Sequence, residues 1–238
     1  VKADAALARV AIELNSKLTE LCPTNGITFG PGGCCDPHNT LYMTAYEQGA
    51  QAHNYSSVGE SLQNVARLFV APCSTTLRPP YVSGTYVLWD LDYAHCLDSL
   101  AGATVSELRG LALKSQRVPG WVMDLPEPAR TQKATCVSLY GSPNVFFQYE
   151  PHISIGYVDN DCKGYEGGLA AAVQAAYAAV PAAKTAVAIM EEIGYAVSGP
   201  YGTVPQGGEL GSVKLLGTES AAWQAGEGST RLLREYLL

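Results

Sequence analysis

A short motif occurs twice in this chain, and it constrains the fold more than any other feature of the sequence. One copy is PHNTLYM at residues 37–43, and the other is PHISIGY at residues 151–157. Both read proline, histidine, any residue, a hydroxyl residue and then an aliphatic residue. Each copy lies in a segment with strand-forming residues, and a helix pattern follows each of them. The repetition indicates an internal duplication, with one histidine-bearing strand in each half of the chain.

Segments with helical and with strand periodicity alternate along the 238 residues, so we expect a mixed α and β fold. Helices are predicted at 3–21, 57–69 and 106–114, and an alanine-rich helix at 168–194 that is kinked or divided at Pro181. Strands are predicted at 38–46, 84–93, 134–140, 145–158 with a break at Pro151, and 211–223. Residues 23–33 are rich in glycine and proline and are expected to form a loop, and GSPN at 141–144 is expected to form a turn.

Composition and charge exclude several classes of protein. Hydrophobic residues make up 47% of the chain and charged residues 16%, which is typical of a packed globular protein and too apolar for a disordered one. The formal net charge is -7, and lysine and arginine form no runs, so we expect no binding to duplex nucleic acid. A small phosphate ester needs only a local positive site and stays open as a ligand. No apolar run approaches the roughly 20 residues that span a bilayer, so we expect no membrane-spanning helix and no membrane partner.

The cysteines are compatible with a secreted protein. None of them forms a CxxC pair of the kind that zinc ribbons use, so we expect no structural zinc site. The chain begins at Val1 without a methionine and carries the glycosylation sequon that starts at Asn54. If the protein is secreted, we expect three disulfides and one leftover thiol; otherwise it is cytoplasmic and its cysteines are buried thiols. The seven cysteines are Cys22, Cys34, Cys35, Cys73, Cys96, Cys136 and Cys162.

The spacing within each motif suits one type of reaction. In a strand, residues i and i+2 point to the same side, so His38 shares a side with Thr40, and His152 shares one with Ser154. If the two strands lie side by side, two imidazoles and two hydroxyls converge on one small volume. Phosphoryl transfer between oxygens needs a base, an acid and donors to the nonbridging oxygens. Histidine supplies both proton-transfer roles because its ordinary pKa is about 6.5, so no metal or other cofactor is required.

The paired motifs HNTL (38–41) and HISI (152–155) resemble the H-x-[ST]-aliphatic motifs of the 2H phosphoesterase superfamily, which includes RNA 2′,3′-cyclic phosphodiesterases and 2′-5′ RNA ligase-like proteins. The aromatic segment NVFFQYEPHISIGYV and the later VKLLGTES are also similar to the C-terminal lobe of that family. The resemblance implies an α+β fold in which residues 1–238 form a single bilobal domain. Its two lobes would be pseudo-symmetric α/β units whose antiparallel sheets line a central groove.

The resemblance also implies an activity. The family's enzymes are metal-independent phosphodiesterases, so the expected substrate is a 2′,3′-cyclic phosphate, a 2′-5′ linkage or a related small cyclic ester in a small nucleotide or short oligonucleotide. The two motif histidines are 114 positions apart (152 minus 38), which is wide for the family. We therefore expect an insertion around residues 70–130.

The candidate site residues follow from the motifs. His38 and His152 are the predicted acid and base, in either order, and Thr40 and Ser154 are predicted to hold the phosphoryl oxygens. Three tyrosines are predicted to bind substrate, with packing as the alternative role of each: Tyr42, Tyr149 and Tyr157. Tyr42 is the first candidate, because the i+4 count places it on the side of His38 and Thr40.

Other functions stay open at this point. A cysteine hydrolase would use Cys34 or Cys35, which lie in a glycine-rich loop, although acidic neighbours do not lower the pKa of a thiol. A metal bound by the two motif histidines would need a carboxylate ligand that the sequence does not indicate. A secreted protein that binds a nucleotide or another ligand without catalysis could have the same fold, although binding alone does not need two titrating groups. The other histidines, His53 and His95, lack a hydroxyl residue at the motif spacing and are expected to be structural or exposed.

Overall fold

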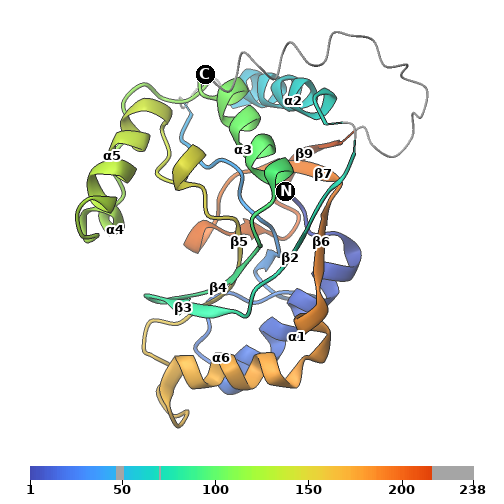
Figure 1. The fold of residues 1–238 in the computed structure, drawn as a ribbon, viewed down its shortest axis with the longest axis vertical. Coiled ribbons are helices and arrows are strands. Elements are labelled where there is room, and N and C mark those ends of the chain that lie inside the picture. Colours follow the sequence, from blue (N-terminus) through green and yellow to red (C-terminus); the bar gives the residue numbers. More distant parts are fainter. Residues whose placement is uncertain (47–50, 70, 216–238) are drawn as a thin grey trace.

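The computed structural model describes residues 1–46, 51–69 and 71–215 of the chain (Figure 1). The fold is mixed α and β, as expected, and the strand pairings of this part are antiparallel. Its helices are α1 (Ala5–Leu21), α2 (Gln51–Arg67), α3 (His95–Leu108), α4 (Gly120–Met123), α5 (Ala129–Tyr140), α6 (Gly168–Ala179) and the 3-10 helices η1 (Phe146–Gln148), η2 (Pro181–Thr185) and η3 (Pro200–Gly202). Its strands are β1 (Cys35–Asp36), β2 (Cys73–Thr76), β3 (Tyr81–Ser83), β4 (Tyr86–Asp90), β5 (His152–Tyr157), β6 (Val187–Met190), β7 (Glu192–Ala196), β8 (Val204–Pro205) and β9 (Glu209–Lys214).

The strands form small sheets that single bridges join together. Strands β3, β4 and β5 form a three-stranded sheet, and the others pair as β1 with β8, β2 with β6, and β7 with β9. Beyond β5, Ile153 pairs with Asn39, and the neighbouring His38 pairs with Lys2. The amide of Lys2 then donates to the carbonyl oxygen of Glu192, the first residue of β7 (3.3 Å). Backbone pairing therefore runs from β3 across both motifs to β9, and the two motifs lie next to each other.

Two pairs of helices cover different parts of this arrangement. Helices α1 and α6 pack against each other, α1 also contacts β5, and α6 contacts β3. Helices α2 and α3 pack against each other, and α2 also contacts β7 and β9. Figure 1 shows the two pairs at opposite ends of the molecule, with the strands between them. The motifs lie where the sheet of β5 meets the strands next to β7.

Helix α1 forms where the apolar periodicity predicts it. Its N-cap is Asp4, whose Oδ1 accepts hydrogen bonds from the amides of Ala6 (2.8 Å) and Leu7 (3.0 Å). Leu7, Leu14 and Leu18 lie on its buried side, at the spacing of one helix face. Burial of each leucine contributes roughly 1.5–3 kcal/mol, so this face fixes α1 beneath β5.

Strand β5 contains a bulge that decides which side chains reach its open side. Two consecutive residues of β4 pair with Ser154 and Gly156, so Ile155 is an extra residue in β5. The bulge shifts the alternation by one residue. Tyr157 therefore lies on the same side of the sheet as Ser154, although simple alternation from Ser154 places it on the other side.

Buried asparagines bind the backbone groups at this bulge. The Nδ2 of Asn15 donates to the carbonyl oxygen of Ile155 (2.9 Å) and to that of Ile27 (2.8 Å). The Oδ1 of Asn25 accepts from the amide of Tyr157 (2.9 Å). An unpaired buried backbone group costs about 1–3 kcal/mol, so these side chains stabilise the irregular part of the strand.

The structure contains three disulfides and one thiol, which is compatible with the count expected for a secreted protein. Cys22 at the end of α1 is joined to Cys162 after β5, and Cys73 of β2 is joined to Cys96 of α3. The third disulfide joins two adjacent residues, Cys34 and Cys35, just before the first motif. The thiol is Cys136, which is buried in α5.

Two predictions of secondary structure were wrong because local composition was overridden by tertiary packing. The predicted strand 134–140 is the second half of α5, whose buried side includes Lys133 and Val137. The glycine of the predicted GSPN turn, Gly141, is the left-handed C-cap that ends this helix, with a φ of 75°. The predicted helix after Pro181 is instead η2 followed by β6 and β7, because β6 pairs with β2, a strand about a hundred residues earlier in the chain.

Other boundaries also differ from the prediction. Only residues 106–108 of the predicted helix 106–114 are helical, as the end of α3, which starts at His95. The predicted helix 57–69 is part of α2, which starts at Gln51 and ends at Arg67. The first part of the predicted strand 145–158 is η1, and β5 starts only after Pro151. The predicted strand 38–46 has isolated bridges at residues 38, 39 and 46 only. The last predicted strand is β9 at 209–214, and its residues from 216 onward lie outside the described part.

Candidate functional site

The bridge between the middle residues of the two motifs, Asn39 and Ile153, brings the motifs together. Both of these side chains are buried, and the residues on either side of them point to the opposite face because side chains alternate along a strand. We call this opposite face the motif face. It carries the four predicted catalytic residues: His38, Thr40, His152 and Ser154. Because the bridge is antiparallel, each histidine stands across from the hydroxyl residue of the other motif.

Both imidazoles are held in the same way. The Nδ1 of His38 lies 3.0 Å from the carbonyl oxygen of Asp36, and the Nδ1 of His152 lies 2.7 Å from that of Glu150. A carbonyl oxygen only accepts, so Nδ1 carries the hydrogen in both rings. His38 has a second backbone hydrogen bond, with Gly202. In each motif a proline separates the histidine from the acidic residue whose carbonyl oxygen it binds. The local geometry of the two motifs is therefore repeated together with their sequence.

Asn39 links the two motifs, and the motif pattern did not reveal this role. Its side chain is 2% exposed. Its Oδ1 accepts a hydrogen bond from the amide of His152 (3.1 Å), and its Nδ2 donates to the hydroxyl of Tyr149 (2.8 Å). The residue between the histidine and the hydroxyl of one motif thus positions the histidine of the other.

The surroundings of His38 favour its neutral form. Burial lowers the pKa of His38 from 6.5 to about 4 and outweighs the backbone hydrogen bonds with Asp36 and Gly202, which raise it; the charged amino group of Val1 lowers it further. The charge of His152 also lowers this pKa, which places the two imidazoles within electrostatic range of each other. His38 is therefore neutral at neutral pH, as a general base must be.

A cavity of about 700 Å³ lies beside the first motif. His38, Thr40 and Tyr42 line it, together with Lys2 and with parts of α2, β7 and β9. His152 and Ser154 do not line it. The cavity therefore extends from the first motif toward β7 and β9, and the histidine and serine of the second motif lie outside it.

Tyr157 lies on the motif face within a group of three tyrosines. Its ring stacks on that of Tyr201, with centroids 4.0 Å apart and planes at 21°, and it meets the edge of Tyr86 at 5.0 Å. Tyr201 is exposed and has a φ of 60°, which is uncommon for a residue other than glycine. The group provides an aromatic surface on the same side of the sheet as Ser154.

The other two predicted tyrosines have different surroundings. Tyr149 is 9% exposed and lies under the site, where its hydroxyl binds Asn39. Tyr42 is half-buried, and its hydroxyl donates to the carbonyl oxygen of Tyr140 at the end of α5. Tyr42 still lines the same cavity as His38.

Asp90 is a charged residue of the motif face that the motifs did not indicate. Strand β4 pairs it directly with His152. Its Oδ1 is buried and has no hydrogen-bond partner in the described part of the chain. Burial raises the pKa of Asp90, and the charge of His152 acts against that rise. The pairing of β4 with β5 was not visible in the sequence, so no local signal pointed to this residue.

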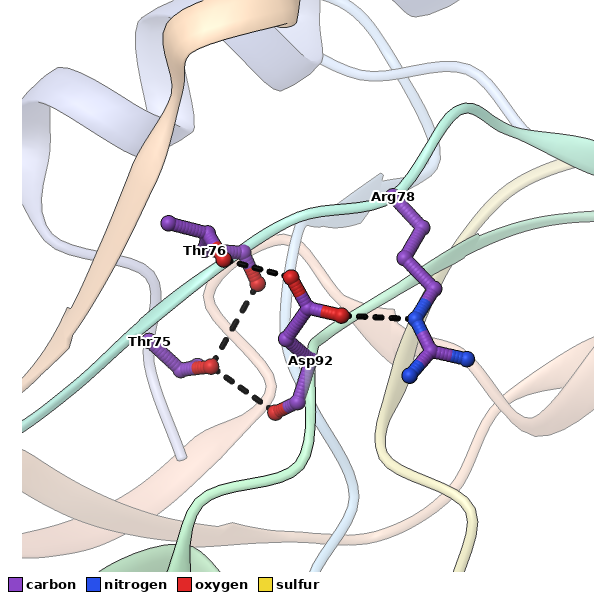
Figure 2. Close-up of polar contacts among 4 residues, drawn as sticks. All are labelled: Thr75, Thr76, Arg78 and Asp92. Atoms are coloured by element: carbon purple, nitrogen blue, oxygen red, sulfur yellow. Dashed lines mark hydrogen bonds and ion pairs between the residues drawn. The ribbon is translucent and has the colours of Figure 1, made fainter.

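The next carboxylate along the chain, Asp92, is by contrast well paired (Figure 2). The Nε of Arg78 donates to its Oδ1 (2.6 Å), and the hydroxyl of Thr76 donates to its Oδ2. The hydroxyl of Thr75 donates to its backbone carbonyl oxygen (2.8 Å). The hydrogen bonds from Thr76 and Arg78 lower the pKa of Asp92. The guanidinium of Arg78 is thus bound by Asp92 rather than by Asp90.

Three other observations bear on the alternative functions. The sulfur atoms of Cys34 and Cys35 form a disulfide, so neither is a thiolate nucleophile in this structure. Among residues 1–46, 51–69 and 71–215, no group of three or more histidine, cysteine, aspartate or glutamate side chains is arranged to hold a metal ion. Within the same residues, no helix has the length and apolar character needed to cross a membrane.

The histidine pair therefore remains the candidate site. Comparison with known proteins adds no further support, since no protein-family model matches the chain and no curated protein matches its sequence.

Proposed function

We propose that this protein is a metal-independent phosphodiesterase that hydrolyses a 2′,3′-cyclic phosphate, a 2′-5′ linkage or a related small cyclic phosphate ester. The observation that carries the proposal is the antiparallel pairing of the two motifs at Asn39 and Ile153. It supports the proposal because it puts two imidazoles, each with Nδ1 bound to a backbone carbonyl oxygen, and two hydroxyl residues on one face.

The chemistry of these groups matches the needs of the reaction. A neutral imidazole accepts the proton of the attacking water, and a charged imidazole gives a proton to the leaving oxygen. The hydroxyls of Thr40 and Ser154 donate to the nonbridging oxygens, where negative charge is concentrated. Each histidine faces the hydroxyl of the other motif, so a phosphoryl group over the bridge meets a proton-transfer group and a donor on either side.

The arrangement of the elements supports a bilobal 2H-like architecture for residues 1–238 as part of this proposal. Helices α1 and α6 accompany the sheet of β5, and helices α2 and α3 accompany β7 and β9. One motif stands on each side of the junction between them. The insertion around residues 70–130 stays a prediction.

The surroundings of the site favour a small nucleotide or short oligonucleotide as substrate. The net charge of -7 opposes a long polyanion. The tyrosine group at Tyr157, Tyr86 and Tyr201 offers ring surface beside Ser154, and stacking of a base on an aromatic side chain contributes about 1–3 kcal/mol.

The proposal is tested by hydrolysis of 2′,3′-cyclic nucleotides and short 2′-5′ oligonucleotides in the presence of EDTA. Wild type is compared with His38→Ala, His152→Ala and, as a matched control, His95→Ala, because the His95 side chain is exposed and bonds only to Tyr93 among the described contacts. We expect each motif variant to lose about 10²–10⁴-fold in rate and the control to keep the rate of wild type.

Two outcomes contradict the proposal. Loss of wild-type activity on chelation points to metal catalysis. Binding of a nucleotide without turnover by wild type points to a ligand-binding protein with the same site.

A further inference from the structure

The two imidazoles of the motif face have different charged neighbours. On one side, His152 pairs across strands with Asp90, whose Oδ1 is buried without a hydrogen-bond partner in the described residues. On the other side, His38 pairs with Lys2, and the amino group of Val1, which donates to the carbonyl oxygen of Asn39 (2.6 Å), also acts on His38. The ammonium of Lys2 binds Glu192 (3.1 Å) and Glu209 (2.8 Å), so the carboxylates on that side are already occupied. An unpaired carboxylate oxygen thus belongs to the cross-strand partner of His152 and not to that of His38.

The other titratable groups near His152 do not cancel this asymmetry. Arg78, on the far side of Asp90, is bound by Asp92. Burial raises the pKa of Asp90, and the charge of Arg78 acts against that rise, which favours the carboxylate. Tyr81, from β3, hydrogen-bonds to Asp90 and is itself neutral at neutral pH, since burial raises its pKa above 10.0. Glu150 adds a further negative charge near Asp90. The charge that faces His152 from its neighbouring strands is therefore negative.

We propose that Asp90 is a positioning residue that keeps a proton on His152, so that His152 is the general acid and His38 the general base of the hydrolysis proposed above. The inference rests on that proposed function. It goes beyond the motif pattern, in which the two histidines are equivalent.

The roles define each step. The Nε2 of His38 removes a proton from water as the water oxygen forms a bond to phosphorus. The bond from phosphorus to the leaving ester oxygen breaks, and the Nε2 of His152 gives its proton to that oxygen. One proton has then moved to His38 and one has left His152, and exchange with solvent restores the starting forms. The overall change is addition of one water across one phosphorus–oxygen bond.

The first experiment reads protonation without depending on activity. The imidazole nitrogens of isotope-labelled protein are followed by NMR as a function of pH, in wild type, Asp90→Asn, Asp90→Glu and the matched control Asp92→Asn. At about pH 6 we expect His38 to be neutral and His152 to carry the proton. Asp90→Asn should lower the protonated fraction of His152 at least about threefold, whereas Asp90→Glu and Asp92→Asn should keep it. An unchanged His152 in Asp90→Asn, or a proton on His38 instead, overturns the inference.

The second experiment uses kinetics to determine which histidine is the acid and which is the base. A diester with a 4-nitrophenolate leaving group needs no proton on the leaving oxygen, so loss of the acid should matter little. We expect His152→Ala to come within about tenfold of wild type on such an ester while His38→Ala stays about 10²-fold or more below it. The opposite order reverses the roles and overturns the inference, while the proposed phosphodiesterase stands.

The pH profile separates a positioning role from a merely structural one. The acid must be protonated, so Asp90→Asn should move the alkaline limb of the pH–rate profile to lower pH by about one pH unit, and Asp90→Glu should restore it. A variant that is only destabilised loses activity without this displacement, and that result contradicts the inference. If no substrate in the panel is turned over while NMR places the proton on His152, the proposed function fails and the charge asymmetry holds.

Discussion

At the scale of single residues, His38 should make the stability of the protein depend on pH. Its pKa is about 4 in the folded chain and 6.5 without the fold. Between these values the unfolded chain binds more protons, so the free energy of unfolding falls as pH drops from 6.5 towards 4. The effect reaches at most about 3 kcal/mol, at roughly 1.4 kcal/mol per pH unit. Urea unfolding of His38→Gln across this range should show a flatter dependence than wild type, and exposed His95→Gln should not.

Replacement of Asn39 should also lower the free energy of unfolding. Asn39→Ala leaves the amide of His152 and the hydroxyl of Tyr149 without partners in the core, at a cost of about 1–3 kcal/mol in unfolding free energy. Tyr149→Phe removes only one of these hydrogen bonds and should cost about 1 kcal/mol. Equal losses in the two variants, measured by urea unfolding, would argue against a role of Asn39 in holding His152.

Features of the site that depend on a single strand could be predicted from the sequence, and features that depend on the pairing of distant strands could not. Alternation within a strand was enough to place each motif hydroxyl on the side of its histidine. Asp90 and Asn39 could not be assigned, because their roles depend on which strands pair, and pairing partners more than 60 residues apart leave no local pattern. The side of the sheet on which Tyr157 lies could not be derived either. It depends on the bulge at Ile155, where Asn15 of α1 binds the strand backbone, and this contact leaves no pattern in the sequence.

At the scale of elements, close packing of α1 against β5 should limit Gly156 to glycine. A Cβ at this position would meet Leu18 Cδ2 at 2.7 Å and Val87 Cγ2 at 3.1 Å. Gly156→Ala is expected to lower the unfolding free energy by about 1–3 kcal/mol. Leu18→Ala alone should cost about 2–5 kcal/mol, and the double variant should be less destabilised than the two losses added together, by about 1 kcal/mol. Simple additivity would show that the two elements do not meet as described.

The elements also differ in how well they can be predicted from the sequence. Helix α1 and strand β4 were predicted because each has a complete apolar periodicity and a clear signal at its start or end. Residues 134–140 predict a strand because Thr135, Val137 and Leu139 alternate with smaller or polar residues, but these residues belong to helix α5. The alanine-rich segment that contains β6 predicts a helix, and the pairing of β6 with β2 is visible only in the fold.

At the scale of the whole molecule, one disulfide closes most of the chain. Cys22 and Cys162 are 140 positions apart, and Cys73 and Cys96 are 23 apart. Because a longer closed loop removes more freedom from the unfolded chain, Cys22→Ala with Cys162→Ala should cost about 5 kcal/mol and Cys73→Ala with Cys96→Ala about 3 kcal/mol. Thermal unfolding of the two double variants checks the order. The reverse order would mean that strain or residual structure, rather than loop length, sets the effect.

The antiparallel pairing of the motifs also bears on which isomer of a product is released. A cyclic diester laid over the bridge at Asn39 and Ile153 can bind in two orientations that exchange O2′ and O3′. With His152 as the acid, the orientation decides which oxygen leaves, and so whether a 2′- or a 3′-monophosphate forms. Asp90 stands on one side only, so one regioisomer should be in excess with wild type and the excess should fall with Asp90→Asn, although the burial of His38 keeps part of the difference. Chromatography of the 2′- and 3′-monophosphates therefore measures how strongly the carboxylate of Asp90 makes the two motif histidines differ in their roles.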